Sequence, residues 1–113
     1  LGFELMHVGI NAADENEADS VASGFEKLFG FTKKTGSSSV FAGTAVEVMK
    51  FPYLGKSGHL AIGTNYIERA IYHLEKSGVE FDMDTAKKNA KGKLAAVYVT
   101  GEIGGFAVHL LQK

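Results

Sequence analysis

The feature that most constrains the fold is a strand-like segment that occurs twice, near the start of the chain and near its middle. The copies run from Met6 to Asn11 and from Gly58 to Thr64, and each holds one histidine, His7 or His59, in a short alternating run. Because side chains alternate across a strand, we place both histidines on the face away from the core. A unit used twice, with an imidazole at the same place, indicates a site between two halves, although a single such histidine is more often structural.

Each copy opens a unit that we predict as strand, helix and three further strands. The first helix begins at Asp14, which with Glu17 resembles a capping box, and stops at Gly30. The second begins at Asn65, which with Glu68 repeats this pattern, and ends at Gly78. We therefore expect residues 1–113 to form one domain, with repeat 1 over about 5–51, a linker over 52–57 and repeat 2 over about 58–112.

Composition excludes several classes of function. The chain has 113 residues, 45% hydrophobic and 22% charged, with a net charge of −1, so no charge argument favours nucleic acid or an acidic membrane surface. It has no cysteine, which excludes disulfides, thiolate metal sites and cysteine nucleophiles. No apolar run is long enough to span a bilayer, and we expect a cytoplasmic protein. Because it begins at Leu1, we expect a processed protein, a trimmed chain or a domain of a longer one.

The last strand of each unit adds a further residue of metal-binding type. Glu47 lies on the face opposite to Val46 and Val48, and His109 lies opposite to the apolar face of the final strand. Taken alone, Glu47 is more readily explained as a solvated or paired carboxylate. Three imidazoles and one carboxylate suit Zn²⁺, Ni²⁺, Co²⁺ or Fe²⁺ better than Mg²⁺ or Ca²⁺. The set is His7, Glu47, His59 and His109; the fourth histidine, His73, is interpreted as a surface residue.

A polar segment over 82–93 contains four lysines, at positions 87, 88, 91 and 93. It has two interpretations, a mobile flap that meets an anionic substrate or a solvated hairpin loop. Loops are commonly polar for solvation alone, so the hairpin loop is favoured.

The duplicated unit resembles the vicinal oxygen chelate superfamily, which includes glyoxalase I, methylmalonyl-CoA epimerase, extradiol dioxygenases, fosfomycin-resistance transferases and bleomycin-resistance proteins. The resemblance rests on His7, Glu47, the segment 58–62 and the closing segment 105–109. It implies an α+β fold in which two βαβββ repeats form an incomplete eight-stranded barrel with helices outside. It also implies that His7, Glu47, His59 and His109 are metal ligands. His109 departs from the glyoxalase I pattern, which has glutamate there.

A narrower resemblance is to the domain of this type appended to some bacterial 2-keto-3-deoxy-phosphogluconate (KDPG/KHG) aldolases. It rests on the segment 102–112 and on the strand entry over 91–94. This resemblance implies fusion to, or association with, an aldolase domain. By analogy with the superfamily we also expect a homodimer. From the near-neutral net charge and the lack of a bilayer-length apolar run we expect no nucleic-acid or membrane partner.

The leading functional hypothesis is a metal-dependent, glyoxalase-like lyase or isomerase that acts on a small α-keto or α-hydroxy substrate through an enediolate. Glu47 would be the base, and neutral His109 could serve instead. The alternative is a non-catalytic small-molecule-binding or accessory domain, either part of an aldolase or a sequestering protein like those of bleomycin resistance, with Phe51 and Tyr98 lining the cleft. A third interpretation is an oxygen-activating Fe²⁺ enzyme, since two histidines and a carboxylate suit that chemistry.

Overall fold

The chain forms one mixed sheet of eight strands with two helices, and the computed structural model describes residues 1–113. In chain order the elements are β1 (Glu4–Asn11), α1 (Glu15–Phe29), β2 (Lys33–Thr35), β3 (Ser39–Ala42), β4 (Val46–Met49), β5 (Gly58–Thr64), α2 (Ile67–Lys76), β6 (Phe81–Lys88), β7 (Leu94–Ile103) and β8 (Phe106–Gln112).

The order of the strands across the sheet is β2-β3-β4-β1-β5-β8-β7-β6. The first strands of the two units, β1 and β5, pair antiparallel at the centre, and each pairs in parallel with the last strand of its own unit, β4 or β8. The sheet does not close, because β2 and β6 are its edges. The expected α+β fold, with two βαβββ units in an incomplete eight-stranded barrel and helices outside, is confirmed.

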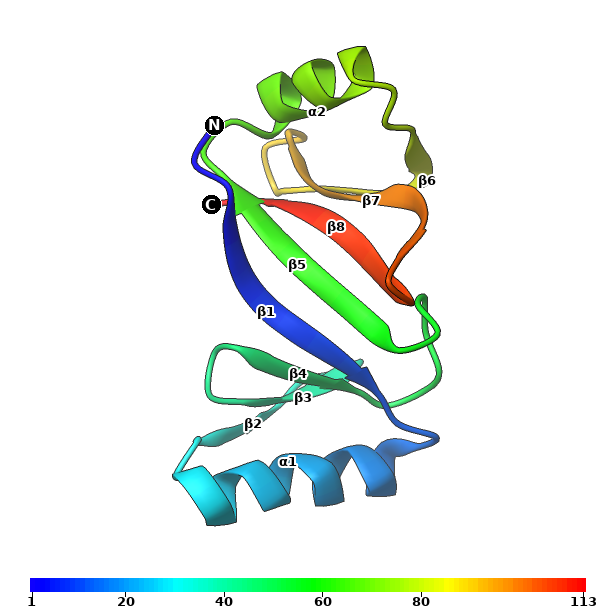
Figure 1. The fold of residues 1–113 in the computed structure, drawn as a ribbon. Coiled ribbons are helices and arrows are strands. Elements are labelled where there is room, and N and C mark those ends of the chain that lie inside the picture. Colours follow the sequence, from blue (N-terminus) through cyan, green and yellow to red (C-terminus); the bar gives the residue numbers. More distant parts are fainter.

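Two separate clusters of apolar side chains form the core, one beneath each helix. The first packs α1 against β3 and β4, and the second packs α2 against β7 and β8. The helices lie at opposite ends of the molecule with β1 and β5 between them, as Figure 1 shows. Along β4, Val46 and Val48 face the first cluster, whereas Glu47 and Met49 face a cavity on the other side of the sheet. The helices therefore leave one face of the central strands free for polar residues.

Local sequence determines both ends of α1. Asp14 is the N-cap and accepts a hydrogen bond from the backbone N of Glu17 at 2.8 Å, and the Glu17 carboxylate accepts one from the N of Ala13 at 3.0 Å. At the other end Gly30 adopts φ 73°, and its N–H donates to the carbonyl of Glu26. A residue with a side chain rarely adopts this φ, so glycine is the expected stop signal.

The predicted capping pair of α2, Asn65 and Glu68, is not formed. The N-cap is Tyr66, whose own side chain makes no cap hydrogen bond. Instead, Gln112 at the end of β8 accepts a hydrogen bond from the N of Ile67 at 2.9 Å and donates from Nε2 to the carbonyl of Asn65 at 2.6 Å. The prediction is wrong because the acceptor comes from 45 residues away, which local spacing does not reveal.

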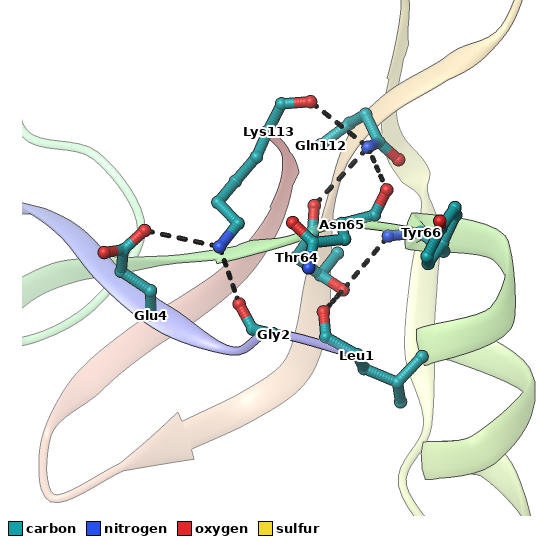
Figure 2. Close-up of polar contacts among 8 residues, drawn as sticks. All are labelled: Leu1, Gly2, Glu4, Thr64, Asn65, Tyr66, Gln112 and Lys113. Atoms are coloured by element: carbon teal, nitrogen blue, oxygen red, sulfur yellow. Dashed lines mark hydrogen bonds and ion pairs between the residues drawn. The ribbon is translucent and has the colours of Figure 1, made fainter.

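The two ends of the chain meet beside this cap, as Figure 2 shows. The Nζ of Lys113 donates to the carbonyl of Gly2 at 2.8 Å and lies 3.3 Å from the carboxylate of Glu4. The Thr64 hydroxyl donates to the carbonyl of Leu1 at 2.8 Å. These contacts hold the start of β1 against the ends of β5 and β8.

The polar segment 82–93 is not a loop throughout. β6 continues to Lys88, so the turn between β6 and β7 is confined to residues 89–93. β7 in turn continues to Ile103 and leaves a turn at 104–105. Neither helix is long and apolar enough to span a bilayer.

Candidate metal centre

Four neighbouring strands, β4, β1, β5 and β8, each contribute one of the predicted site residues, which are Glu47, His7, His59 and His109. The strand register alternates these large side chains with small residues. Gly9 lies between Glu47 and His59 in one row, and Ala61 lies between His7 and His109 in the next. This stagger lets side chains from separate strands converge on one point above the sheet. The structure therefore brings all four predicted residues together.

Three atoms at the centre of this group form a small triangle. The Nε2 atoms of His7 and His59 lie 3.2 Å apart, and Oε1 of Glu47 lies 3.2 Å from the first and 3.0 Å from the second. His109 offers a ring nitrogen as well, and the ligating nitrogens of the three histidines all lie within 4.8 Å of one another. The three imidazoles meet edge to face, with ring centroids 5.3–5.6 Å apart.

The Glu47 carboxylate is ionised in this environment. Burial raises its pKa, but hydrogen bonds from His59, His7 and Ser39 outweigh burial and hold the pKa well below its usual range. The Ser39 hydroxyl donates to Oε2 at 2.7 Å and leaves Oε1 to the two imidazoles. The carboxylate is thus both charged and fixed in orientation.

His109 is neutral at physiological pH. Burial lowers its pKa to about 4, and His59, His7 and Lys87 add to this effect, while Glu47 opposes it. Its ring stacks on Tyr98 with centroids 4.6 Å apart, and its Nε2 is buried without a hydrogen-bond partner. A neutral imidazole with an unused lone pair can ligate a metal or accept a proton.

The donor set fits a divalent transition metal. Bonds of about 2.1 Å would separate neighbouring ligand atoms by roughly 3.0 Å in octahedral and 3.4 Å in tetrahedral geometry, close to the edges of the triangle formed by His7, His59 and Glu47. The unpartnered nitrogen of His109 supports the same fit. One feature departs from common metal sites: Nδ1 of His59 has no acceptor, whereas the second nitrogen of a metal-bound histidine usually donates a hydrogen bond.

A cavity of about 270 Å³ opens over this group. The linker at 52–57 supplies part of its wall through Tyr53, whose ring meets Phe51 and Tyr98 edge to face at 6.0 and 6.1 Å. Asn11 holds the linker by donating from Nδ2 to the carbonyls of Tyr53 and Gly55, each at 3.1 Å. The predicted lining residues Phe51 and Tyr98 both lie in this wall.

Sequence reasoning missed two residues that support the group. Gly9 lies against the His59 ring: a Cβ at this position would lie 1.9 Å from Cε1 of His59. Ser39 is the buried first residue of β3 and orients Glu47. The position of Gly9 on the same strand face as His7 was visible in the sequence, but nothing local marks Ser39.

No protein-family model matches the chain, and no curated protein matches it. Solved structures do match over nearly its whole length. A hypothetical protein, BH1468 from Bacillus halodurans C-125, is 16% identical with a TM-score of 0.68, covering 100% of this chain and 96% of the other. Methylmalonyl-CoA epimerase from Streptomyces coelicolor is 16% identical with a TM-score of 0.67, covering 97% and 94%. The Mycobacterium tuberculosis epimerase is 16% identical with a TM-score of 0.62, covering 96% and 86%.

At these identities the similarity establishes the fold alone. The epimerases belong to the vicinal oxygen chelate superfamily, so this chain has the glyoxalase-like fold that its sequence resembles.

Proposed function

We propose that the chain is a metal-dependent lyase or isomerase of the glyoxalase type, acting on a small substrate with two neighbouring oxygens. The observation that carries this proposal is the convergence of three histidine nitrogens within 4.8 Å, with the Glu47 carboxylate 3.0 and 3.2 Å from two of them, beneath an open cavity. His7, Glu47, His59 and His109 would hold a divalent ion such as Zn²⁺, Ni²⁺, Co²⁺ or Fe²⁺. When bound, such an ion stabilises negative charge that develops on a substrate oxygen next to it.

Glu47 is the proposed proton acceptor. Its pKa is low because imidazole N–H groups and the Ser39 hydroxyl donate to it, while burial acts in the opposite direction. In the loaded site the nitrogens of His7 and His59 would ligate the ion and no longer donate to Glu47. A Glu47 carboxylate that leaves the ion would then keep only the hydrogen bond from Ser39 and would be available to take up a proton. If His109 does not ligate the ion, its unpartnered Nε2 is the second proposed proton acceptor in the same cavity.

Metal binding is the first test. Chelator-treated protein is titrated with Ni²⁺ or Zn²⁺ by calorimetry, and we expect one ion per chain and a loss of roughly 100-fold or more in affinity for His59→Ala. His73→Ala is the control, since this exposed histidine lies on α2 outside the group. Absence of stoichiometric binding, or equal affinity in the wild type and His59→Ala, would rule the proposal out.

Proton transfer is the second test. The loaded protein is incubated in D₂O with small 2-hydroxy and 2-keto acids, and also with methylmalonyl-CoA, which a structurally similar epimerase binds. We expect deuterium to enter the carbon next to a carbonyl group of at least one compound, and Glu47→Gln to abolish the exchange. If deuterium exchange is as fast in Glu47→Gln as in the wild type, the proton acceptor is His109 instead of Glu47. Loss of exchange in His109→Gln would then test that assignment.

The second candidate function is binding without catalysis, as in bleomycin-resistance proteins or as an accessory domain of an aldolase. The aromatic wall formed by Phe51, Tyr53 and Tyr98 favours it, because apolar rings beside a few polar groups are typical of ligand pockets. The two epimerases described above are not aldolases, so this association rests on sequence resemblance. Tight binding of a metabolite by metal-free protein, with no proton exchange, would support this alternative.

Pairing into a homodimer and a cytoplasmic location are also proposals. The first is tested by light scattering of the purified chain, which would give the mass of two chains, and the second by fractionation of source cells.

A further inference from the structure

The edge strand β6 does not follow a regular hairpin register with β7. Asp82 pairs with Tyr98, but the next recorded pair joins Lys87 to Ala96, so the segment 83–86 lies against the single residue Val97. In a regular antiparallel ladder the residue opposite Ala96 would be Asp84. The irregularity therefore places the ammonium group of Lys87 opposite Ala96, where a regular ladder would place the carboxylate of Asp84.

Hydrogen bonds hold this bulge in a defined shape. The backbone N of Tyr98 donates to the Thr85 hydroxyl at 2.9 Å, and this hydroxyl donates to the carbonyl of Asp82 at 2.6 Å. The N of Asp84 donates to the side chain of Asp82 at 3.1 Å. Bulges of this kind re-aim side chains next to functional sites. Here both Thr85 and Lys87 line the cavity over the candidate metal centre.

Lys87 is the only lysine or arginine among the residues that line this cavity, and Glu47 is the only carboxylate. Lys33, Lys50 and Lys113 each form an ion pair with a carboxylate of the chain, whereas Lys87 forms none. With a divalent ion in place, the positive charges of the ion and of Lys87 exceed the single negative charge of Glu47, so the cavity favours an anionic ligand.

The size of the cavity limits that ligand. A volume of about 270 Å³ lies below the range of roughly 300–1,000 Å³ that is typical of pockets for drug-sized ligands, so the cavity favours a small ligand. We propose that Lys87 binds a second anionic group of the substrate, a carboxylate or a phosphate, at the end of the molecule away from its two neighbouring oxygens. This assignment rests on the proposed function and narrows the substrate to a small acid with an anionic group at each end.

Matched pairs of acids test the assignment by calorimetry on protein loaded with Ni²⁺. The carboxylate pair is 2-oxoglutarate and 2-oxopentanoate, and the phosphate pair is 3-phosphoglycerate and glycerate. Within each pair only the distal charged group is present or missing. We expect the wild type to prefer the charged member of at least one pair by roughly three- to tenfold, as for a charge pair that is partly open to solvent. The pair that shows the preference identifies the anion.

Variants at two neighbouring lysines distinguish the effect of a charge inside the cavity on acid binding from the effect of positive charge elsewhere on the surface. We expect Lys87→Gln to lose the preference while its affinity for the uncharged acid is unchanged, and Lys87→Arg to keep it. The control is Lys88→Gln, since both lysines are exposed but only Lys87 lines the cavity. Equal affinities within both pairs in the wild type, or a preference that survives in Lys87→Gln, would overturn the assignment.

Failure of the metal centre gives a different result. If Ni²⁺ titration shows no bound ion, the proposed function is wrong, and the same acid pairs are measured on the metal-free chain. A preference that still depends on Lys87 would then retain the anion site without the metal chemistry. If the metal-free chain shows no preference that depends on Lys87, both the proposed function and the anion site at Lys87 are overturned.

Discussion

The Gly9→Ala substitution would place a methyl group where the imidazole of His59 lies. A Cβ at Gly9 would be 1.9 Å from Cε1 and 2.0 Å from Nδ1 of His59. The φ of Gly9 is not positive, so alanine meets no backbone strain there and the effect is purely steric. To restore an ordinary contact of about 3.5 Å, the ring would have to move by about 1.5 Å. His59 is 1% exposed and lines the cavity, so the ring can move only by displacing its neighbours or by shifting into the cavity, and either movement takes it away from its place beside His7 and Glu47.

A shift of this size is large for both metal binding and packing. Ligand distances in metal sites hold to about 0.2 Å, so a ring displaced by about 1.5 Å no longer ligates with the others. We expect the affinity for Ni²⁺ or Zn²⁺ to fall by roughly 100-fold or more, and the free energy of unfolding of the metal-free protein to fall by about 1 to 3 kcal/mol from overpacking.

Calorimetric metal titration and thermal unfolding measure these two effects, with Gly24→Ala as the control. Gly24 lies in α1, and a methyl group added there would have no neighbouring atom within 4 Å, so alanine should leave metal binding unchanged and stabilise the helix by about 0.5 to 1 kcal/mol. The double variant Gly9→Ala/His59→Ala isolates the contact between the added methyl group and the His59 ring. Without that ring, Gly9→Ala should no longer lower the free energy of unfolding. Wild-type metal affinity in folded Gly9→Ala, or the same packing cost in both backgrounds, would refute the reasoning.

Three further predictions concern single residues. His109 has a pKa of about 4 in the folded metal-free protein and 6.5 when unfolded, so the unfolded state binds more protons between these two pH values. The free energy of unfolding should therefore fall by at most about 3 kcal/mol as the pH drops from 6.5 to 4. Unfolding of His109→Gln, measured over the same pH range, should lack this loss. Gln112→Leu removes the acceptor of the N of Ile67, and chemical unfolding should show a loss of about 1 to 3 kcal/mol. Ser39→Ala frees Oε2 of Glu47, and metal affinity by calorimetry should fall roughly 10-fold or more, whereas an unchanged affinity would remove Ser39 from the site.

The strand faces of this protein follow from local pattern. Alternation along the first and fifth strands placed His7 and His59 away from the core, and the pattern around Glu47 put Val46 and Val48 on the opposite face. In the structure Val48 is fully buried beneath α1, while Glu47 lines the cavity. These predictions succeed because a two-residue period depends only on the local backbone geometry.

Two features depended on partners that the local pattern does not contain. The Asn65–Glu68 capping pair was plausible by spacing, but Gln112 satisfies the first turn of α2 from another strand. The lysines of 82–93 suggested a solvated hairpin loop, but a bulge closed by Thr85 extends β6 and turns Lys87 toward the cavity. In both cases a tertiary contact overrides a weak local preference.

Residue pattern was enough to establish that one unit occurs twice, that α1 runs between Asp14 and Gly30, and that His7, Glu47, His59 and His109 occupy the non-core faces of their strands. That these side chains meet is a property of the folded chain. Antiparallel pairing of β1 with β5 sets Gly9 beneath the His59 ring and brings the two Nε2 atoms to 3.2 Å, across 52 residues of chain. Convergence of this kind depends on the pairing and register of distant strands, which long-range packing selects and no local spacing encodes.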